Sequence, residues 1–370
     1  MVRGRRPSRK REMNRAFLII ALALSLAVFG CSGEPTRSQF ETYTWDVATA
    51  EEQGFNPQIL DSAFAQARQL GFVDGLLVIR NGRLVAERYY NGYTGSTPHN
   101  VMSVSKSFLS AMTGIALRER LIENIDVKVL PYFPEYIYPD IDERKYDISI
   151  RHLLSMRMGI ESESSNYWTI YNSDNWLKTT IELPLLSAPG ERHRYNTFQT
   201  HLLSAIITKA SGMDTKTFAE TYLLDPMRIS LYHWEQDPQG YYFGGNSMHF
   251  SPREMAVLGY LYLQDGMLDG TQIVPKEWVD FTLSPSTDNS SNQWGAFENY
   301  NYAYLWWLGQ INGHDLFMGY GWGGQFVVVF PSLNLVVVST ADPYVDGETS
   351  TIQEFAIFDI IADYILPAIN

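Results

Sequence analysis

The stretch GLLVIRNGRLVAERYY, residues 75–90, decides how the chain begins to fold. Two apolar runs flank the pair Asn81-Gly82, and an Asn-Gly pair between such runs is the strongest short-range signal of a β-hairpin. The preceding stretch NPQILDSAFAQARQLG, which begins at Asn56, places apolar residues at helical spacings and ends at Gly71, which predicts a helix. The chain therefore opens with a helix, a strand, a tight turn and a second strand.

Beyond the hairpin, the pattern changes twice. A second amphipathic helix is predicted over residues 104–121, and residues 122–290 carry further helical patterns without a comparable run of strands. After Tyr300 come the β-rich segments YAYLWWLG, HDLFMGYG, QFVVVFP and LNLVVVSTA, followed by the helical run TSTIQEFAIFDIIADYIL. Strands near both ends and helices between them predict an α+β fold, in which one antiparallel sheet is built from both termini and flanked by helices.

The same patterns divide the chain into segments. A polar stretch with Pro and Gly precedes the first predicted helix, as expected of a tether. The predicted segments are a signal peptide over 1–30, a tether over 31–41 and one folded domain over 42–370, with an α/β part at about 42–121 and 295–370 and an inserted helical part at about 122–294.

The first thirty residues have the pattern of an export signal. Seven basic residues precede the uncharged run AFLIIALALSLAVFG, residues 16–30. Fifteen residues span only about 22 Å as a helix, short of the roughly 30 Å hydrocarbon core, so a permanent transmembrane anchor is the weaker interpretation. Met13 is a second candidate for the start of this signal.

The single cysteine, Cys31, directly follows this run. The sequence Val28-Phe29-Gly30-Cys31 resembles a bacterial lipobox, although Phe29 stands where a small residue is usual. This resemblance implies an exported lipoprotein, lipidated at Cys31 and anchored to a membrane, facing the periplasm or the cell exterior. Plain secretion and a buried free thiol in a cytosolic protein are the alternatives.

Composition excludes several classes of protein. The chain has 370 residues, of which 45% are apolar and 19% charged, so intrinsic disorder is excluded. Outside residues 1–30 there are 21 basic and 40 acidic side chains, and such a surface argues against nucleic-acid binding. One cysteine cannot make an internal disulfide, and the seven histidines show no metal-binding spacing, so no metal or cofactor is predicted.

A serine and a lysine mark the predicted start of the second helix. Ser103 and Lys106 are three residues apart, which puts both side chains on one face of a helix. A lysine amine can then reach the serine hydroxyl, and the helix N-terminus favours negative charge that develops there. The spacing alone is common, but here it follows a hairpin and is its only occurrence in the chain.

In this context the Ser-x-x-Lys sequence resembles the serine β-lactamase and penicillin-binding protein superfamily. The most similar branch is the class C β-lactamase-like group of esterases, D-amino-acid peptidases and 6-aminohexanoate-dimer hydrolases. A second family motif, Tyr-x-Asn or Tyr-x-Ser, is matched in kind by Tyr195-Asn196-Thr197 before a predicted helix. Thr197 departs from the family pattern, which points towards an esterase or amidase rather than a dedicated β-lactamase.

The third family motif, Lys-Thr-Gly on a strand near the C-terminus, aligns with Gly319-Tyr320-Gly321 and the residues after it. Both the lysine and the threonine are absent, which weakens an interpretation as a β-lactamase. The resemblance implies substrate-binding or oxyanion-binding roles for this segment, with the backbone N–H of Trp322 as one oxyanion donor. The residues so predicted are Thr197, Gly321, Trp322, Gly323, Gly324 and Gln325.

The resemblance implies that Ser103 attacks a carbonyl carbon and forms an acyl-enzyme, with Lys106 or Tyr195 as the base. The expected partner is therefore a small ester or amide substrate. A β-lactamase or D-amino-acid peptidase, and a non-catalytic lipoprotein that binds peptide or peptidoglycan, remain open as alternatives. The sequence does not decide the substrate, the oligomeric state or which of the two side chains is the base.

Overall fold

The computed structural model describes residues 42–287 and 291–370. The predicted signal peptide, Cys31 and the predicted tether lie outside these residues, so their roles stay predictions. Within the described part of the chain, no helix is both long and apolar enough to cross a membrane.

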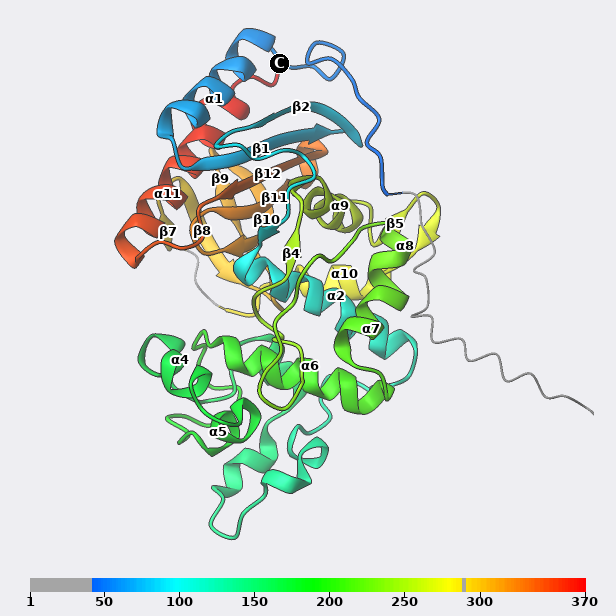
Figure 1. Cartoon of the computed structure of the whole chain (residues 1–370), viewed down its shortest axis with the longest axis vertical. Coiled ribbons are helices and arrows are strands. Elements are labelled where there is room, and N and C mark those ends of the chain that lie inside the picture. Colours follow the sequence, from blue (N-terminus) through cyan, green and yellow to red (C-terminus); the bar gives the residue numbers. More distant parts are fainter. Residues whose placement is uncertain (1–41, 288–290) are drawn as a thin grey trace, which may run out of the picture. The chain divides into compact units, whose positions relative to one another are not determined.

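An antiparallel sheet of eight strands lies at the centre of the fold, in the order β2-β1-β12-β11-β10-β9-β8-β7. Strand β1 from the N-terminal hairpin pairs along its length with β12, the last strand of the chain, so residues far apart in sequence lie side by side (Figure 1). This arrangement confirms the predicted fold class. The strands are β1 Val73–Arg80, β2 Arg83–Tyr89, β7 Gln293–Trp294, β8 Phe297–Tyr302, β9 Trp307–Ile311, β10 His314–Gly321, β11 Gln325–Phe330 and β12 Leu335–Ala341.

Helices account for most of the remaining elements in the described residues. Two further sheets have only two short strands each, and the pair that matters for the site joins β3 (His99–Asn100) to β4 (His249–Phe250). The other short pair is β5 Met267–Leu268 with β6 Thr271–Gln272. The helices are α1 Pro57–Leu70, α2 Ser105–Arg118, α3 Ile150–Leu154, α4 Glu163–Tyr171, α5 Trp176–Glu182, α6 Thr197–Ser211, α7 Thr215–Ala219, α8 Asp225–Met227, α9 Pro252–Leu263, α10 Lys276–Thr282 and α11 Gly347–Ile360.

The first elements follow the local signals. The Asn56 side chain caps α1 by accepting from two backbone N–H groups, and Gly71 ends the helix in the left-handed conformation. Asn81 and Gly82 both have positive φ, at 52° and 73°, which the tight turn between β1 and β2 requires. These short-range signals therefore suffice to place the first three elements.

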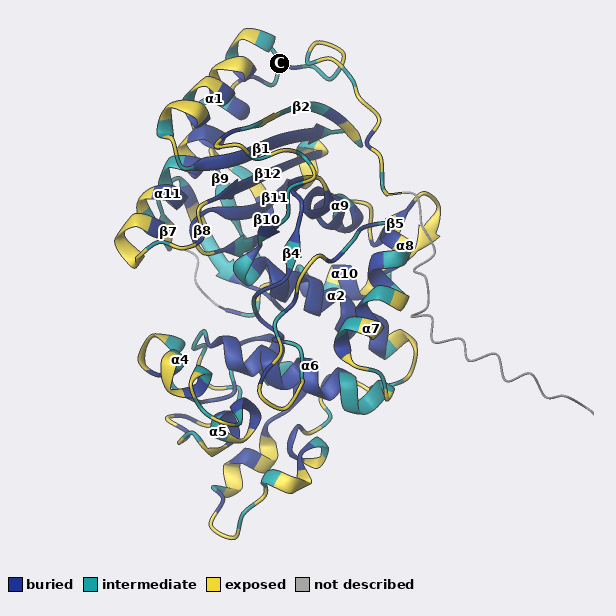
Figure 2. Ribbon diagram, in the orientation of Figure 1, coloured by how far each residue is buried: buried dark blue, intermediate teal, exposed yellow. Residues whose placement is uncertain are grey.

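Both faces of the sheet are covered by helices. Alternate residues of each strand point in opposite directions, so each strand contributes side chains to both faces. In β1, Leu76 and Val78 join a core with α1 and α11, whereas Leu77 and Ile79 join a larger core with α2, α9 and the helical part. Strands β11 and β12 and residues 105–116 of α2 are accordingly buried (Figure 2). The sheet thus separates two apolar cores, and α2 belongs to the larger one.

Two local predictions were wrong. The helix after the hairpin is not amphipathic, because residues 105–116 are all buried, so α2 is enclosed on every side. The C-terminal strands also begin earlier than predicted, because β7 and β8 start before Tyr300, where the polar sequence gave no strand signal. Within the β-rich segment YAYLWWLG, β8 ends at Tyr302 and β9 begins at Trp307, with Leu305 at a φ of 71° between them.

Candidate active site

Ser103 lies in a tight 3-10 turn, Met102–Val104, between β3 and α2. It therefore lies directly before the helix that starts at Ser105, one residue later than the predicted start at residue 104. Met102 has a φ of 48°, uncommon for a residue with a side chain, and the Asn100 side chain accepts from its backbone N–H at 3.0 Å. This conformation leaves Ser103 partly exposed at the N-terminal end of a buried helix.

Lys106 lies one turn further on, and its ammonium group is buried with three partners. Its Nζ donates to Ser103 Oγ at 2.8 Å, to Thr197 Oγ1 at 3.0 Å and to the carbonyl oxygen of Gly245 at 2.7 Å. The side chain is only 2% exposed. Burial lowers the pKa of Lys106 from 10.5 to about 8, although the nearby charge of Glu163 acts in the opposite direction. A neutral amine next to the serine hydroxyl is therefore accessible near neutral pH.

Tyr195 completes the group that the sequence motifs predicted. Its ring lies below Lys106 Nζ, 4.9 Å from the ring centroid, and its phenol is within hydrogen-bonding reach of Ser103. Burial raises the pKa of Tyr195 well above 10, followed by the charge of Glu163, while the hydrogen bond with Ser103 acts in the opposite direction. The phenol therefore stays protonated at neutral pH and can donate a proton.

Thr197 is the first residue of α6, and both its side chain and its backbone are used. Besides accepting from Lys106, it donates its backbone N–H to Glu163 Oε2 at 2.7 Å. The backbone N–H of Glu163 in turn donates to the carbonyl oxygen of Tyr195 at 3.0 Å. Glu163, at the start of α4, thus fixes the segment that carries Tyr195 and Thr197, although no sequence motif marks it.

The turn between β10 and β11 lies beside the turn that carries Ser103. A Cβ atom added to Gly321 would lie 2.5 Å from the carbonyl oxygen of Val101, so only glycine permits this close approach. The next residue, Trp322, is 42% exposed, and its ring Nε1 donates to the carbonyl oxygen of Val345 at 3.2 Å. The two segments predicted to carry the oxyanion donors are thus brought together.

Three of the predicted substrate-binding residues face elsewhere. Gln325 is fully buried, and its amide exchanges hydrogen bonds with the backbone of Ala341 on β12 at 2.7 and 3.2 Å. Gly323 and Gly324 have φ of 75° and 93°, and an added Cβ would meet the backbone of Asp342 and the side chain of Ile357. Packing against β12, its following loop and α11 therefore determines the size of these residues, and their role in substrate binding stays a prediction.

An aromatic wall borders Tyr195. Trp307 stacks near its ring with centroids 6.2 Å apart, and Tyr302 packs edge-on against both rings. Trp306, by contrast, is fully buried in the core and does not reach this wall. Trp307 and Trp322 are thus at least partly exposed, whereas Trp306 is a core residue.

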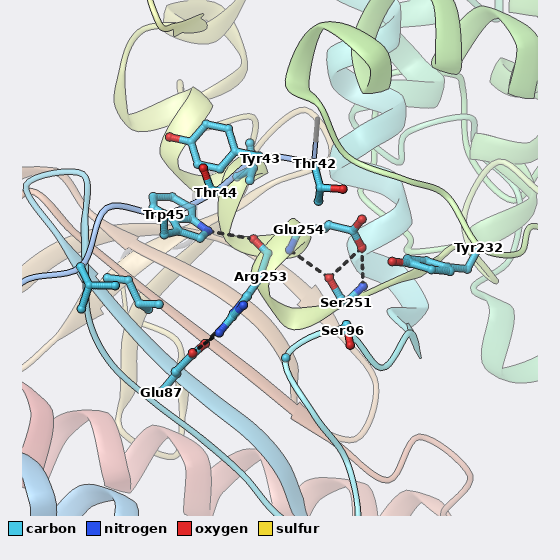
Figure 3. Close-up of a pocket in the computed structure, with 14 residues that line it drawn as sticks. Thr42, Tyr43, Thr44, Trp45, Glu87, Ser96, Tyr232, Ser251, Arg253 and Glu254 are labelled. Atoms are coloured by element: carbon cyan, nitrogen blue, oxygen red, sulfur yellow. Dashed lines mark hydrogen bonds and ion pairs between the residues drawn. The ribbon is translucent and has the colours of Figure 1, made fainter. Parts of the chain in front are cut away.

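A cavity of about 430 Å³ lies apart from these residues, between the start of the described chain, β2 and α9 (Figure 3). An ion pair between Arg253 and Glu87 lies on one side of it, and Trp45 donates to the carbonyl oxygen of Arg253 at 3.2 Å. None of its lining residues belongs to the group around Ser103. Within residues 42–287 and 291–370, no cluster of three or more His, Cys, Asp or Glu side chains is placed to hold a metal ion.

The sheet covered on both faces, with a serine and a buried lysine at the start of its central helix, defines a hydrolase of the β-lactamase and penicillin-binding protein fold. The chain belongs to the β-lactamase family, because the family model described as Beta-lactamase matches residues 60–346. A curated relative, the 6-aminohexanoate-dimer hydrolase of Paenarthrobacter ureafaciens, is 27% identical over 291 residues, which cover 72% of this chain and 71% of the relative.

Solved structures agree with this family in their fold. The octameric penicillin-binding protein homologue from Pyrococcus abyssi matches with a TM-score of 0.62 and 18% identity, covering 85% of this chain and 78% of that one. EstCE1, a hydrolase with promiscuous acyltransferase activity, matches with a TM-score of 0.66 and 15% identity, covering 84% and 98%. At these identities the similarity concerns the fold alone.

Proposed function

We propose that the protein hydrolyses an ester or amide bond of a small substrate through an acyl-enzyme on Ser103. The observation that carries this proposal is the 2.8 Å hydrogen bond between Ser103 Oγ and the buried Nζ of Lys106. A serine hydroxyl is a weak nucleophile and needs a base, and the lowered pKa of Lys106 supplies a neutral amine at the required place.

The acylation step follows from the positions of these groups. Ser103 Oγ attacks the carbonyl carbon and passes its proton to the neutral Nζ of Lys106. The negative charge moves to the carbonyl oxygen, where the backbone N–H groups of Ser103 and Trp322 stabilise it. Tyr195 donates its phenolic proton to the leaving alcohol or amine and recovers a proton from Lys106. The bond to the leaving group breaks, and the acyl group stays on Ser103.

Deacylation uses the same groups in reverse. A water molecule attacks the acyl carbonyl carbon and gives a proton to Lys106 through Tyr195. The bond to Ser103 Oγ then breaks, and the serine oxygen regains its proton from Lys106. The raised pKa of Tyr195 favours this relay role over a lasting phenolate, so the pKa directions favour Lys106 as the base.

Intact-mass spectrometry tests this proposal on the domain that starts at residue 42. The protein is exposed separately to a fluorophosphonate, a p-nitrophenyl ester and a penicillin, with Ser103→Ala as the control. We expect a fluorophosphonate adduct and ester turnover that both disappear in Ser103→Ala. A folded sample that forms no adduct and turns over no ester would contradict the proposal and favour a binding protein, whereas preferential reaction with penicillin would favour β-lactam chemistry.

The substrate can be tested from the names of relatives. Because one relative is named a 6-aminohexanoate-dimer hydrolase, that dimer is the first amide to assay. A short-chain p-nitrophenyl ester is the parallel ester substrate. The ratio of the two kcat/KM values separates an amidase from an esterase.

We also propose that the protein is exported and lipidated at Cys31, on the basis of the sequence signal alone. Metabolic labelling with a radioactive fatty acid tests this proposal in a bacterial host. Label is expected on the full-length protein and not on Cys31→Ser. Equal labelling of both, or of neither, would contradict it.

A further inference from the structure

Helix α11 carries polar residues at buried positions, where a helix packed into a core usually has apolar side chains. Ser350, Gln353 and Glu354 are all at most 2% exposed, at spacings of three and one that place them on one side of the helix. Buried polar groups cost free energy unless they are hydrogen-bonded, so their partners indicate their role. None of them takes part in the chemistry proposed above.

Glu354 holds four donors at once. Its Oε1 accepts from the backbone N–H of Gly323 at 3.2 Å and from Ser350 Oγ at 2.8 Å. Its Oε2 accepts from Trp294 Nε1 at 3.2 Å and from the hydroxyl of Tyr320. An ionised carboxylate has about four lone-pair sites, so this one is fully used inside the protein.

These contacts converge on the turn that carries Trp322. Ser350 Oγ also accepts from the Gly323 N–H at 3.0 Å, and Gln353 Nε2 donates to the Gly323 carbonyl oxygen at 2.8 Å. Both backbone polar groups of Gly323, its N–H and its carbonyl oxygen, are therefore bound by side chains of α11. The ring of Trp322 is held as well, because its Nε1 donates to the carbonyl oxygen of Val345, which lies just before α11.

Tyr320 connects the same carboxylate to the strand that enters the turn. Its hydroxyl donates to Glu354, and its ring lies 5.9 Å from Trp307 in the wall beside Tyr195. Burial raises the pKa of Tyr320 well above 10, followed by the charge of Glu354, so the phenol stays protonated as the donor. One buried charge thus fixes both the turn and part of the aromatic wall.

We infer that Glu354 is a positioning residue that holds the 321–324 turn so that the Trp322 N–H points at the developing oxyanion. The inference rests on the proposed acyl-enzyme function, because it needs Trp322 as an oxyanion donor. An oxyanion donor is effective only in a fixed orientation, and removal of one typically lowers kcat by about 10² to 10³-fold. Glu354 would act through the turn, without touching the substrate.

The variants Glu354→Ala and Glu354→Gln test the inference, because they remove different numbers of acceptor oxygens. Ala removes every acceptor, and we expect kcat for a p-nitrophenyl ester to fall by about 10²-fold with KM little changed, as for a contact made only in the transition state. Gln keeps one acceptor oxygen, but its NH2 must face either the Gly323 N–H or the Trp294 Nε1–H, both of which are fixed donors. We therefore expect a smaller loss of about 10-fold.

Two controls on the same helix separate positioning from stability. Asp359→Asn removes an exposed carboxylate and is expected to leave kcat unchanged. Phe358→Leu disturbs the buried packing of α11 against Phe326, whose ring lies 4.8 Å away, without touching the turn. Thermal unfolding of all four variants shows whether the loss of kcat follows the loss of Tm.

The outcomes are distinguishable. The positioning role is supported if Glu354→Gln and Phe358→Leu have similar Tm values but only Glu354→Gln has a reduced kcat. If both Glu354 variants react with the ester at the wild-type rate, or if loss of kcat follows Tm alike in every variant, the inference is overturned. If the wild-type protein itself forms no Ser103 adduct with a fluorophosphonate, the proposed function fails first, and the inference fails with it.

Discussion

At the scale of single residues, the protonation of Lys106 sets the pH range in which Ser103 can react. Burial lowers the pKa of Lys106 to about 8, so the amine is charged and cannot accept a proton well below that pH. We expect kcat/KM for a neutral p-nitrophenyl ester to rise with pH and level off above about 8. A pH–rate profile from pH 6 to 10 checks this, and a rate that still rises at pH 10 without levelling off would show an unperturbed lysine instead.

Glu163 offers an independent test of how neighbouring charge sets the pKa of Lys106. Its carboxylate favours the ammonium form of Lys106, so Glu163→Gln should lower the pKa of Lys106 further and shift the profile to lower pH, by about 0.5 unit or more. The Gln oxygen can still accept from the Thr197 N–H, which keeps the local structure. Glu161→Gln, two residues earlier, is the matched control and should leave the profile in place. An unshifted or upward-shifted profile in Glu163→Gln would contradict the electrostatic argument.

The residues of the site differ in how far the sequence could predict them. Ser103, Lys106 and Tyr195 stand in motifs, and the structure brings all three together. Glu163 stands in no motif, and only the tertiary fold brings it to Thr197, 34 positions away. Glu354 left no sequence signal either, because the first half of its helix, GETSTIQE, is polar in sequence and does not reveal that Ser350, Gln353 and Glu354 are buried.

At the scale of elements, α2 shows how packing overrides helix propensity. Gly114 lies inside this helix, where alanine would ordinarily stabilise by about 1 kcal/mol. A Cβ atom at Gly114, however, would lie 2.3 Å from Cδ1 of Trp278, a rigid ring on α10. We therefore expect Gly114→Ala to lower the free energy of unfolding by about 1 to 3 kcal/mol. Urea unfolding followed by circular dichroism measures this change.

A second helical glycine provides the control for that prediction. Gly347 begins α11, and an added Cβ would meet nothing closer than a carbon of Trp322 at 3.6 Å, which is ordinary contact. Gly347→Ala should therefore be neutral or slightly stabilising. If Gly114→Ala were also neutral, α2 and α10 would be free to separate, and the close packing at this point would not contribute to stability.

The burial of α2 also explains why the sequence pattern wrongly predicted an amphipathic helix. Periodicity marks a helix that faces solvent on one side, but this helix is covered by the sheet, by α6 and by the following strands and loops. In the sequence, small polar residues such as Ser107 and Ser110 indicate a solvent-exposed face. In the fold they donate to the backbone carbonyl oxygens of Leu305 and Tyr304 at 2.9 Å each. Only the tertiary structure supplies those acceptors.

At the scale of the whole molecule, the two ends of the folded domain hold each other in place. The backbone N–H of Asn56 donates to the carbonyl oxygen of Ala368 at 2.7 Å, and that of Asn370 donates to Gly54 at 2.9 Å. Phe55, between them, forms a β-bridge with Ile369 and is 1% exposed. The sequence predicted a sheet made from both termini, but it gave no sign of this second connection.

Deletion of residues 367–370 should therefore destabilise the fold without altering the chemistry. The two backbone hydrogen bonds between the ends are lost, the ring of Phe55 loses cover, and the cap of α1 at Asn56 loses its support, which together suggest a loss of about 2 to 4 kcal/mol. Ser103 precedes α2 on the opposite face of the sheet from α1, so kcat measured at low temperature should be retained. Removal of Asn370 alone breaks only one of the two bonds and should cost less. Equal urea midpoints for the wild type and the longer deletion would show that the ends contribute nothing to stability, and a loss of kcat in a folded sample would mean that they support the site as well.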